Sequence, residues 1–119
     1  MKEKLITFET AKLAKEKELK IGFINTVYNP SGKLIDLNDR QQEGFIPIQA
    51  PTQSLLQKWL REIHNIDIQI HSISGKYFVK IKYWDRSFHM TSSVEISGKT
   101  YEEALEKGLQ EALKLIKLW

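Results

Sequence analysis

The second half of the chain begins with a helical hydrophobic period that changes abruptly to the period of a strand. From Gln53 to His64, apolar residues recur at spacings of three and four, as in a helix with one core-facing side; they are Leu55, Leu56, Trp59, Leu60 and Ile63. Thr52 is the predicted N-cap, and Asn65 can end the helix in the left-handed conformation. Ile66, Ile68 and Ile70 then alternate with polar residues, which predicts a strand with one buried face.

The stretch K-Y-F-V-K-I-K-Y-W-D, from Lys76 to Asp85, predicts a second strand after a turn at S-I-S-G. One face of this strand carries Tyr77, Val79, Ile81 and Tyr83, and the other carries Lys76, Phe78, Lys80, Lys82 and Trp84. A third strand is expected from roughly Ser87 to Ile96. The residues H-M-T-S-S-V-E-I can hold a bulge or a break in it.

The end of the chain predicts another helix, which runs to Lys117. Thr100 and Glu103 match a capping box, and the inward side is marked by Leu105, Leu109, Ala112, Leu113 and Ile116. The order helix, three strands, helix predicts an α+β fold, with two helices packed on one face of a three-stranded or larger antiparallel sheet.

The first part of the chain predicts a helix and a hairpin that precede this core. Thr7 is expected to cap a helix that runs to Lys20, with Gly22 just beyond its end. Short apolar stretches flank N-P-S-G, which predicts a turn between two strands, and a polar loop leads on to the extended piece F-I-P-I-Q. Residues 1–119 are expected to form a single domain, with 1–50 as an N-terminal subregion and 51–119 as the core.

Composition narrows the class of protein. The 119 residues are 41% hydrophobic and include no cysteine, which excludes disulfides, thiol catalysis and cysteine-based zinc sites. Neither a signal peptide nor a membrane span is evident, so a soluble, cytoplasmic protein without membrane contact is expected. The formal net charge of +3 is too small to indicate nucleic acid by itself.

The distribution of this charge is more informative than its sum. Lys76, Lys80, Lys82 and Arg86, set against Asp85, place the whole positive excess in one strand and the turn after it. Three interpretations remain open. The lysines can simply be solvated, Phe78 and Trp84 can stack on bases while the lysines meet phosphates, or the aromatic residues can anchor a protein partner.

Candidate chemistry is sparse. The only groups that titrate near neutral pH are His64, His71 and His89, and their spacing does not require that two of them meet beside Asp85. S-G-K-T lacks the earlier glycine of a phosphate-binding loop, so helix capping explains it better. We therefore expect no catalytic, cofactor or metal site and no enzymatic activity.

The last helix also has a second apolar edge. Leu115, Leu118 and Trp119 continue the side of the helix that carries Tyr101, Ala104 and Gly108. These residues either fill the core against the N-terminal helix or form the contact of a homodimer across a two-fold axis.

Two long motifs carry a resemblance to a known family. A-P-T-Q-S-L-L-Q-K-W-L-R-E, from Ala50, and Y-E-E-A-L-E-K-G-L-Q-E-A-L-K-L-I, from Tyr101, are similar to motifs of small uncharacterised phage and prophage proteins of gut Bacteroides-type bacteria. The opening L-I-T-F-E-T-A-K-L-A-K-E-K shares the resemblance. It implies a protein of a mobile genetic element in a bacterial cytoplasm and carries no activity with it.

The second half alone has two further resemblances. Its order of elements is similar to that of double-stranded-RNA-binding domains, but Glu102 and Glu103 stand where those domains present lysines. S-G-K-T-Y-E-E-A-L resembles the strand-to-helix corner of HicB-type antitoxins, without the glycine-rich segment that precedes this corner in that family.

The sequence as a whole predicts a non-enzymatic binding or accessory protein of a mobile genetic element, with unknown ligand. The alternative is a nucleic-acid-binding protein that uses the sheet face around Lys76 to Arg86.

Overall fold

The computed structural model describes residues 4–22, 24–36, 47–85 and 90–116, with backbone alone for 84–85 and 90–95. In this part of the chain the elements follow in the order α1 (Phe8–Glu16), β1 (Thr26–Tyr28), β2 (Leu34–Asp36), β3 (Ile48–Gln49), α2 (Gln53–His64), β4 (Asp67–Ile73), β5 (Lys76–Asp85), β6 (Met90–Gly98) and α3 (Tyr101–Lys114). The fold is α+β, as the two hydrophobic periods predict.

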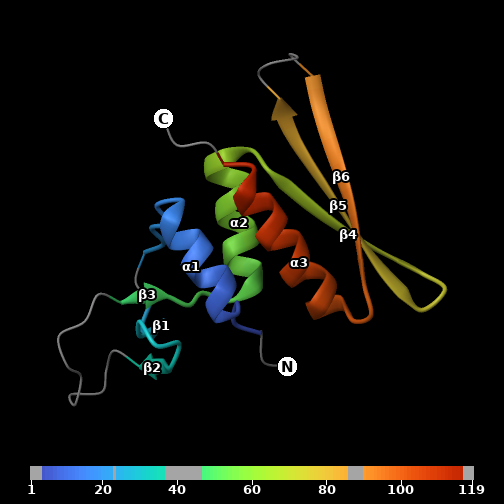
Figure 1. Ribbon diagram of the computed structural model, residues 1–119. Coiled ribbons are helices and arrows are strands. Elements are labelled where there is room, and N and C mark those ends of the chain that lie inside the picture. The colour runs from blue at the N-terminus through green and yellow to red at the C-terminus, as the bar shows by residue number, and fades with distance from the viewer. Residues whose placement is uncertain (1–3, 23, 37–46, 86–89, 117–119) are drawn as a thin grey trace.

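The larger sheet has the antiparallel order β4-β5-β6. Helix α3 packs across one face of all three strands, while α2 packs against β4 and α3 (Figure 1). The pairing of β5 with β6 is continuous from Tyr77↔Gly98 to Asp85↔Met90. Over Met90–Gly98 the third strand therefore has no bulge in its ladder, and the predicted first residues of this strand, 87–89, lie outside the described residues.

The hydrophobic core lies between α3 and the inner face of this sheet. Ile68, Val79 and Ile81 from the sheet and Leu109 and Leu113 from α3 are all buried. Their strand and helix periods place these residues on the faces that meet. One position predicted for the inward side of α2 is wrong, because Ile63 is 62% exposed. It lies in the last turn of α2, one residue before the end of the helix.

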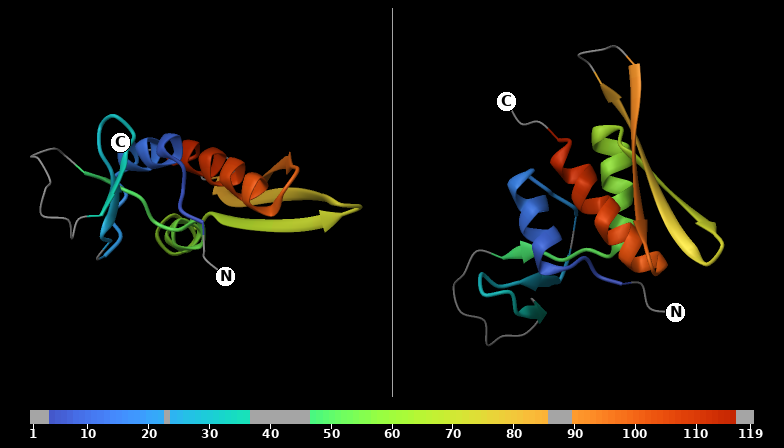
Figure 2. Two further views of the ribbon diagram at one scale, coloured as in Figure 1. Left: turned by 90° about the horizontal axis from the view of Figure 1, so that it is seen from below. Right: turned by 45° about the vertical axis from the view of Figure 1, so that its right-hand side comes forward.

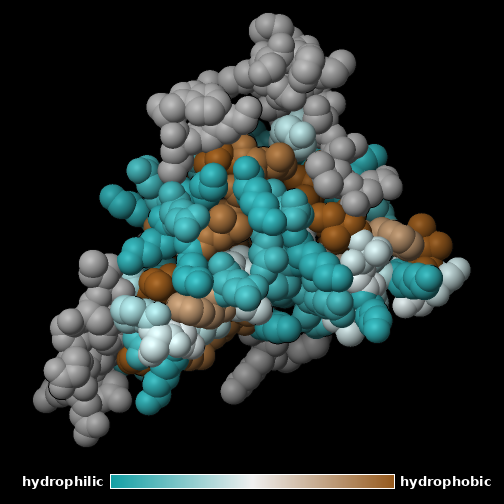
Figure 3. Space-filling view, in the orientation of Figure 1, coloured by the Kyte–Doolittle hydropathy of each residue, from teal (hydrophilic) through white to brown (hydrophobic). Residues whose placement is uncertain are grey.

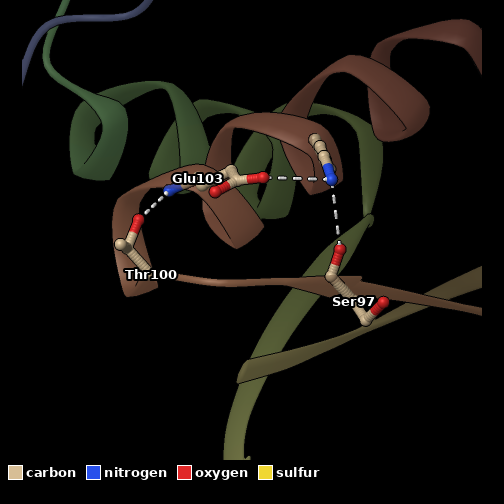
Figure 4. Close-up of polar contacts among 4 residues, drawn as sticks. Ser97, Thr100 and Glu103 are labelled. Carbon is tan, nitrogen blue, oxygen red and sulfur yellow. Dashed lines mark hydrogen bonds and ion pairs between the residues drawn. The ribbon is translucent and has the colours of Figure 1, made fainter. Parts of the chain in front are cut away.

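The start of α3 combines a cap with a side-chain bridge back to the sheet. Thr100 Oγ1 accepts a hydrogen bond from Glu103 N at 3.1 Å, which confirms the predicted cap. The Glu103 carboxylate instead pairs with Lys107 Nζ at 3.3 Å, and Lys107 Nζ also donates to Ser97 O at 3.4 Å (Figure 4). The Thr100 cap and the Lys107 side chain thus both stabilise the corner between β6 and α3.

The N-terminal half packs against the helical side of this core. Helix α1 lies beside α3, and β1 pairs with both β2 and β3 to form a second, smaller antiparallel sheet (Figures 1 and 2). The predicted hairpin is present, with Gly32 at φ +91° in its turn. Helix α1 is shorter than predicted, because it ends at Glu16 and Glu18 takes a left-handed φ of 61°.

Candidate binding surface on the outer sheet face

The face of the larger sheet that points away from α3 collects the basic and aromatic side chains singled out in the sequence. Because residues that pair directly across antiparallel strands share a face, the register defines this surface. The pairs are Asp67↔Lys82, Gln69↔Lys80, His71↔Phe78 and Ile73↔Lys76. We call these eight residues the outer face. The views of Figure 2 show no helix over this side of the sheet.

A hollow lies on the outer face near the turn between β4 and β5. It has a volume of about 350 Å³ and is lined by His71, Ile73, Phe78, Val79 and Lys80. Phe78 and Lys80 are half-buried, whereas Ile73 is 61% exposed. The lining of the hollow thus combines the apolar residues Ile73, Phe78 and Val79 with one lysine, Lys80, and one histidine, His71.

His71 and Ile73 were not among the residues predicted for a binding surface. The sequence signal that could have found them is the turn S-G, since a two-residue turn at Ser74 and Gly75 pairs Ile73 with Lys76 and His71 with Phe78. The pattern of lysines and aromatic residues lies on the second strand alone. The hollow forms only where β4 and β5 pair, because both strands contribute residues to its lining.

Charges on the outer face are mixed in sign. Lys82 is the register partner of Asp67, and Lys80 lies between the register positions of Gln69 and Glu95. Asp67 Oδ2 in turn accepts a hydrogen bond from Gln69 Nε2 at 3.0 Å. The Asp67 carboxylate beside Lys82 weakens a phosphate-binding field at that end of the outer face, because it opposes the attraction of its lysine neighbour.

Two further predicted contact residues lie outside what the structure describes. Arg86 is outside the described residues, and of Trp84 only the backbone is described. His89, a candidate for proton transfer, is outside as well. Contacts by Trp84 and Arg86 therefore stay predictions.

The predicted dimer contact on α3 is only partly described. Leu118 and Trp119 lie outside the described residues, and Leu115 is half-buried against the core. Ala104 and Gly108, on the same apolar edge, are buried inside the molecule, where a Cβ at Gly108 would lie 2.6 Å from Val79 Cγ1. This part of the edge packs on the sheet, so Ala104 and Gly108 are not available for a dimer contact.

A buried carboxylate lies on the opposite side of α3. Glu106 is 8% exposed, and its Oε2 accepts hydrogen bonds from Thr7 N at 3.0 Å and from the Thr7 and Thr10 hydroxyls, while Oε1 accepts one from Gln53 Nε2 at 2.8 Å. Thr7 is the N-cap of α1 and donates its main-chain amide, whereas Gln53 is the first residue of α2 and donates through its side chain. Burial, followed by the charge of Glu106, raises the pKa of Tyr28. With four donors on its two oxygens, Glu106 is a structural group rather than a free catalytic base.

The histidines do not converge in the described structure. His64 contacts Trp59, with ring centroids 4.7 Å apart, and burial lowers its pKa. His71 lies on the outer face, away from the helices. Within residues 4–22, 24–36, 47–85 and 90–116, no group of three or more His, Asp or Glu side chains could hold a metal ion.

Comparison with known proteins adds no relative. No protein-family model matches the chain, and neither the curated proteins nor the solved structures contain a significant match. Among the helices described, none has the length and apolar character needed to cross a bilayer.

Proposed function

We propose that this chain is a non-enzymatic binding protein whose contact surface is the outer face, and that its partner is a protein. The observation that supports this most directly is the hollow beside Phe78, an apolar site within a face of mixed charge. Protein interfaces combine such aromatic anchors with polar rims. The proposed setting, a mobile genetic element in a bacterial cytoplasm, rests on the motifs of the sequence.

The arrangement of titratable groups supports a binding role over catalysis. The buried carboxylate of Glu106 is held by four donors at helix starts. On the outer face, His71 has Phe78 as its cross-strand neighbour, and no described carboxylate shares the hollow with it. A general base normally needs a group that orients it.

Site-specific photocrosslinking tests the location of the surface. A photoreactive phenylalanine analogue at Phe78 is expected to capture a defined protein from the bacterial host or its phage, and excess unlabelled parent protein should compete with the capture. The matched control carries the same analogue at Lys58, an exposed position on α2. Equal capture from both positions would contradict the outer face as the contact surface.

Nucleic-acid binding is the second candidate, and the neighbouring positions of Phe78 and Lys80 in the hollow favour it. A base stacked on Phe78 would bring its phosphate near the ammonium group. Phe78→Ala should then weaken binding of a single strand by about 1–3 kcal/mol, and loss of one contacting lysine should lower the log-log salt slope by about one.

Fluorescence anisotropy with single- and double-stranded oligonucleotides at low salt separates the two candidates. The variant Lys80→Glu with Lys82→Glu reverses charge on the outer face, and Lys58→Glu with Lys114→Glu reverses the same charge on exposed positions of α2 and α3. If nucleic acid binds the outer face, only the first pair abolishes binding. Equal loss in both pairs indicates non-specific attraction and leaves the protein partner as the function.

A further inference from the structure

The free edge of β4 is open over one short segment. In the sheet order β4-β5-β6, one side of β4 has no neighbouring strand among the residues that the structure describes. The pair Ile73↔Lys76 closes the two-residue turn and is a hydrogen-bonded pair. Because hydrogen-bonded pairs alternate along an antiparallel ladder, the backbone groups of His71 and Gln69 also bond to β5. The backbone N–H and C=O groups of the residues between them, Ser72, Ile70 and Ile68, point away from β5.

Helix α2 occupies the first part of this edge. Gln57 Nε2 donates a hydrogen bond to Ile68 O at 2.9 Å. This bond satisfies one outward carbonyl and confirms that Ile68 is among the residues whose backbone groups point away from β5. Ile70 and Ser72 have no such partner among the described residues. No described residue covers the backbone of the β4 edge, which we define as Gln69–Ile73, between α2 and the turn.

The β4 edge lacks the features that protect edge strands from pairing. Proteins block such edges with lysine, proline, bulges or a covering helix. Gln69–Ile73 contains no lysine and no proline, and its pairing with β5 is regular. The hairpin that carries it projects beyond α3 (Figures 1 and 2), and hydrophobic atoms lie at this end of the molecule (Figure 3).

We propose that the β4 edge pairs in antiparallel register with the β4 edge of a second copy of this chain, centred on His71. With His71 opposite His71 of the second copy, Ile70 of each chain faces Ser72 of the other. Each of these two pairs exchanges two bonds, so the outward groups of both chains form about four hydrogen bonds. The two sheets then join into one continuous sheet.

The edge itself favours a second copy as the occupant. A shift to Ile70 opposite Ile70 would place Ser72 against Ile68, whose carbonyl Gln57 already holds, and the opposite shift would place Ile70 against the turn. In the register centred on His71, no two Asp, Glu, Lys or Arg residues of like charge lie opposite each other across the new strand pair. A free peptide could form the same bonds, but it would lose more conformational entropy than a hairpin that is already ordered.

The pairing also brings the two hollows together. Ile73 of each copy would lie opposite Gln69 of the other, on the same face as Phe78 and His71. The exposed Ile73 side chain then lies beside Gln69 and His71 of the second copy. This proposal is independent of the partner proposed for the outer face and differs from a dimer contact through Leu115, Leu118 and Trp119.

Cysteine crosslinking tests the register, because the chain has no cysteine of its own. Non-hydrogen-bonded antiparallel partners have Cα atoms about 4.5 Å apart, within the range of a disulfide. The full chain carrying His71→Cys should therefore form a disulfide-linked dimer under mild oxidation. Ile73→Cys is the matched control, because in this register the two cysteines would be offset by about 13 Å along the strands.

Sedimentation over a concentration series tests the association itself. The parent chain and Ser72→Ala should shift from monomer to dimer, and Ser72→Pro should remain monomeric, because proline removes the outward N–H without affecting a bond to β5. Far-UV circular dichroism checks that Ser72→Pro still folds, and the cysteine pair tests the proposal if it does not. A parent chain that stays monomeric, or equal crosslinking at positions 71 and 73, would overturn the proposal.

Discussion

At the scale of single residues, Glu106 best illustrates how this fold uses a charge. A buried carboxylate is costly unless donors surround it. Here the donors come from the starts of α1 and α2, so the charge is satisfied by Thr7, Thr10 and Gln53 rather than by a cation. The sequence shows a glutamate in an amphipathic helix. Its burial depends on which two helices meet there.

Replacement of Glu106 should be strongly destabilising. Glu106→Ala leaves the Thr7 amide without its acceptor and removes one of the two acceptors of Gln53 Nε2, which keeps Glu102 O, and each unsatisfied buried N–H costs about 1–3 kcal/mol. We expect a loss of about 2–4 kcal/mol in the free energy of unfolding, measured by urea denaturation. Glu111→Ala, which removes an exposed pair with Lys114 on the same helix, should change stability by less than about 1 kcal/mol. Similar losses in both variants would contradict the structural role of Glu106.

His64 should give stability a dependence on pH. Burial lowers its pKa in the folded state below the unfolded value of 6.5. Protonation then favours the unfolded chain, so this contribution is complete above pH 6.5 and is lost as pH falls through the folded-state pKa. His64→Gln should unfold with less loss between neutral and mildly acidic pH than the parent. His71→Gln is the control, and a parent-like slope in the His64 variant would exclude the effect.

At the scale of elements, the β4–β5 hairpin and the contact between α3 and the sheet decide the surface of the molecule. Ser74 and Gly75 both have positive φ, 51° and 78°, as a type I′ turn requires. That turn fixes the register, and the register places His71 beside Phe78. A shift by one residue would exchange the outer face with the core.

Ser74→Asn should stabilise the hairpin. Asparagine tolerates positive φ better than serine, and Asn-Gly is the preferred type I′ pair. We expect a gain of about 0.3–1 kcal/mol in thermal or chemical denaturation. Ser74→Val, which is β-branched, should instead destabilise the protein. A stabilising valine would show that the turn has another geometry.

Gly108 should resist a substitution that normally strengthens helices. An exposed glycine replaced by alanine gains up to about 1 kcal/mol, but here the new Cβ would lie 2.6 Å from Val79 Cγ1. Gly108→Ala should therefore destabilise the fold by about 1–3 kcal/mol. The double variant with Val79→Ala should be more stable than the sum of the single changes predicts, as a double-mutant cycle would measure. Simple additivity would contradict the contact.

At the scale of the whole molecule, one core connects the N-terminal half with the sheet domain. Ile6, Ala11 and Ala14 belong to the same buried cluster as Leu56 and Leu109. Lys17 Nζ adds a hydrogen bond to Ile116 O at 2.7 Å, at the far end of α3. The molecule is flat, with extents of 48 × 39 × 21 Å, because the sheet carries helices on one face alone (Figure 2).

Hydrogen exchange should reveal this shared core. Buried amides of α1, such as those of Ala11 and Ala14, are expected to exchange with a free energy close to that of β5, because both open only in the global transition. In Glu106→Ala, protection of α1 should fall below that of β5, since its anchor on α3 is lost. Early, independent exchange of α1 in the parent would indicate two separate cooperative units.

The sequence by itself determined the features that depend on neighbouring residues. The bounds of α2, its cap at Thr52 and its left-handed end at Asn65 agree with prediction, because capping and helical periodicity act within a few residues. The alternation of Ile68, Val79 and Ile81 likewise predicted the buried face of the sheet. These local signals were sufficient to predict an α+β fold.

Only the tertiary structure decided which surfaces meet. Ile63 belongs to the apolar pattern of α2 yet is exposed, and Glu106 looks like a surface residue yet is buried. The smaller sheet joins β1 to β3 across a long stretch of chain, and the hollow arises from the pairing of His71 with Phe78. Each depends on residues distant in the sequence, and a local pattern carries no information on which distant partner removes a side chain from water.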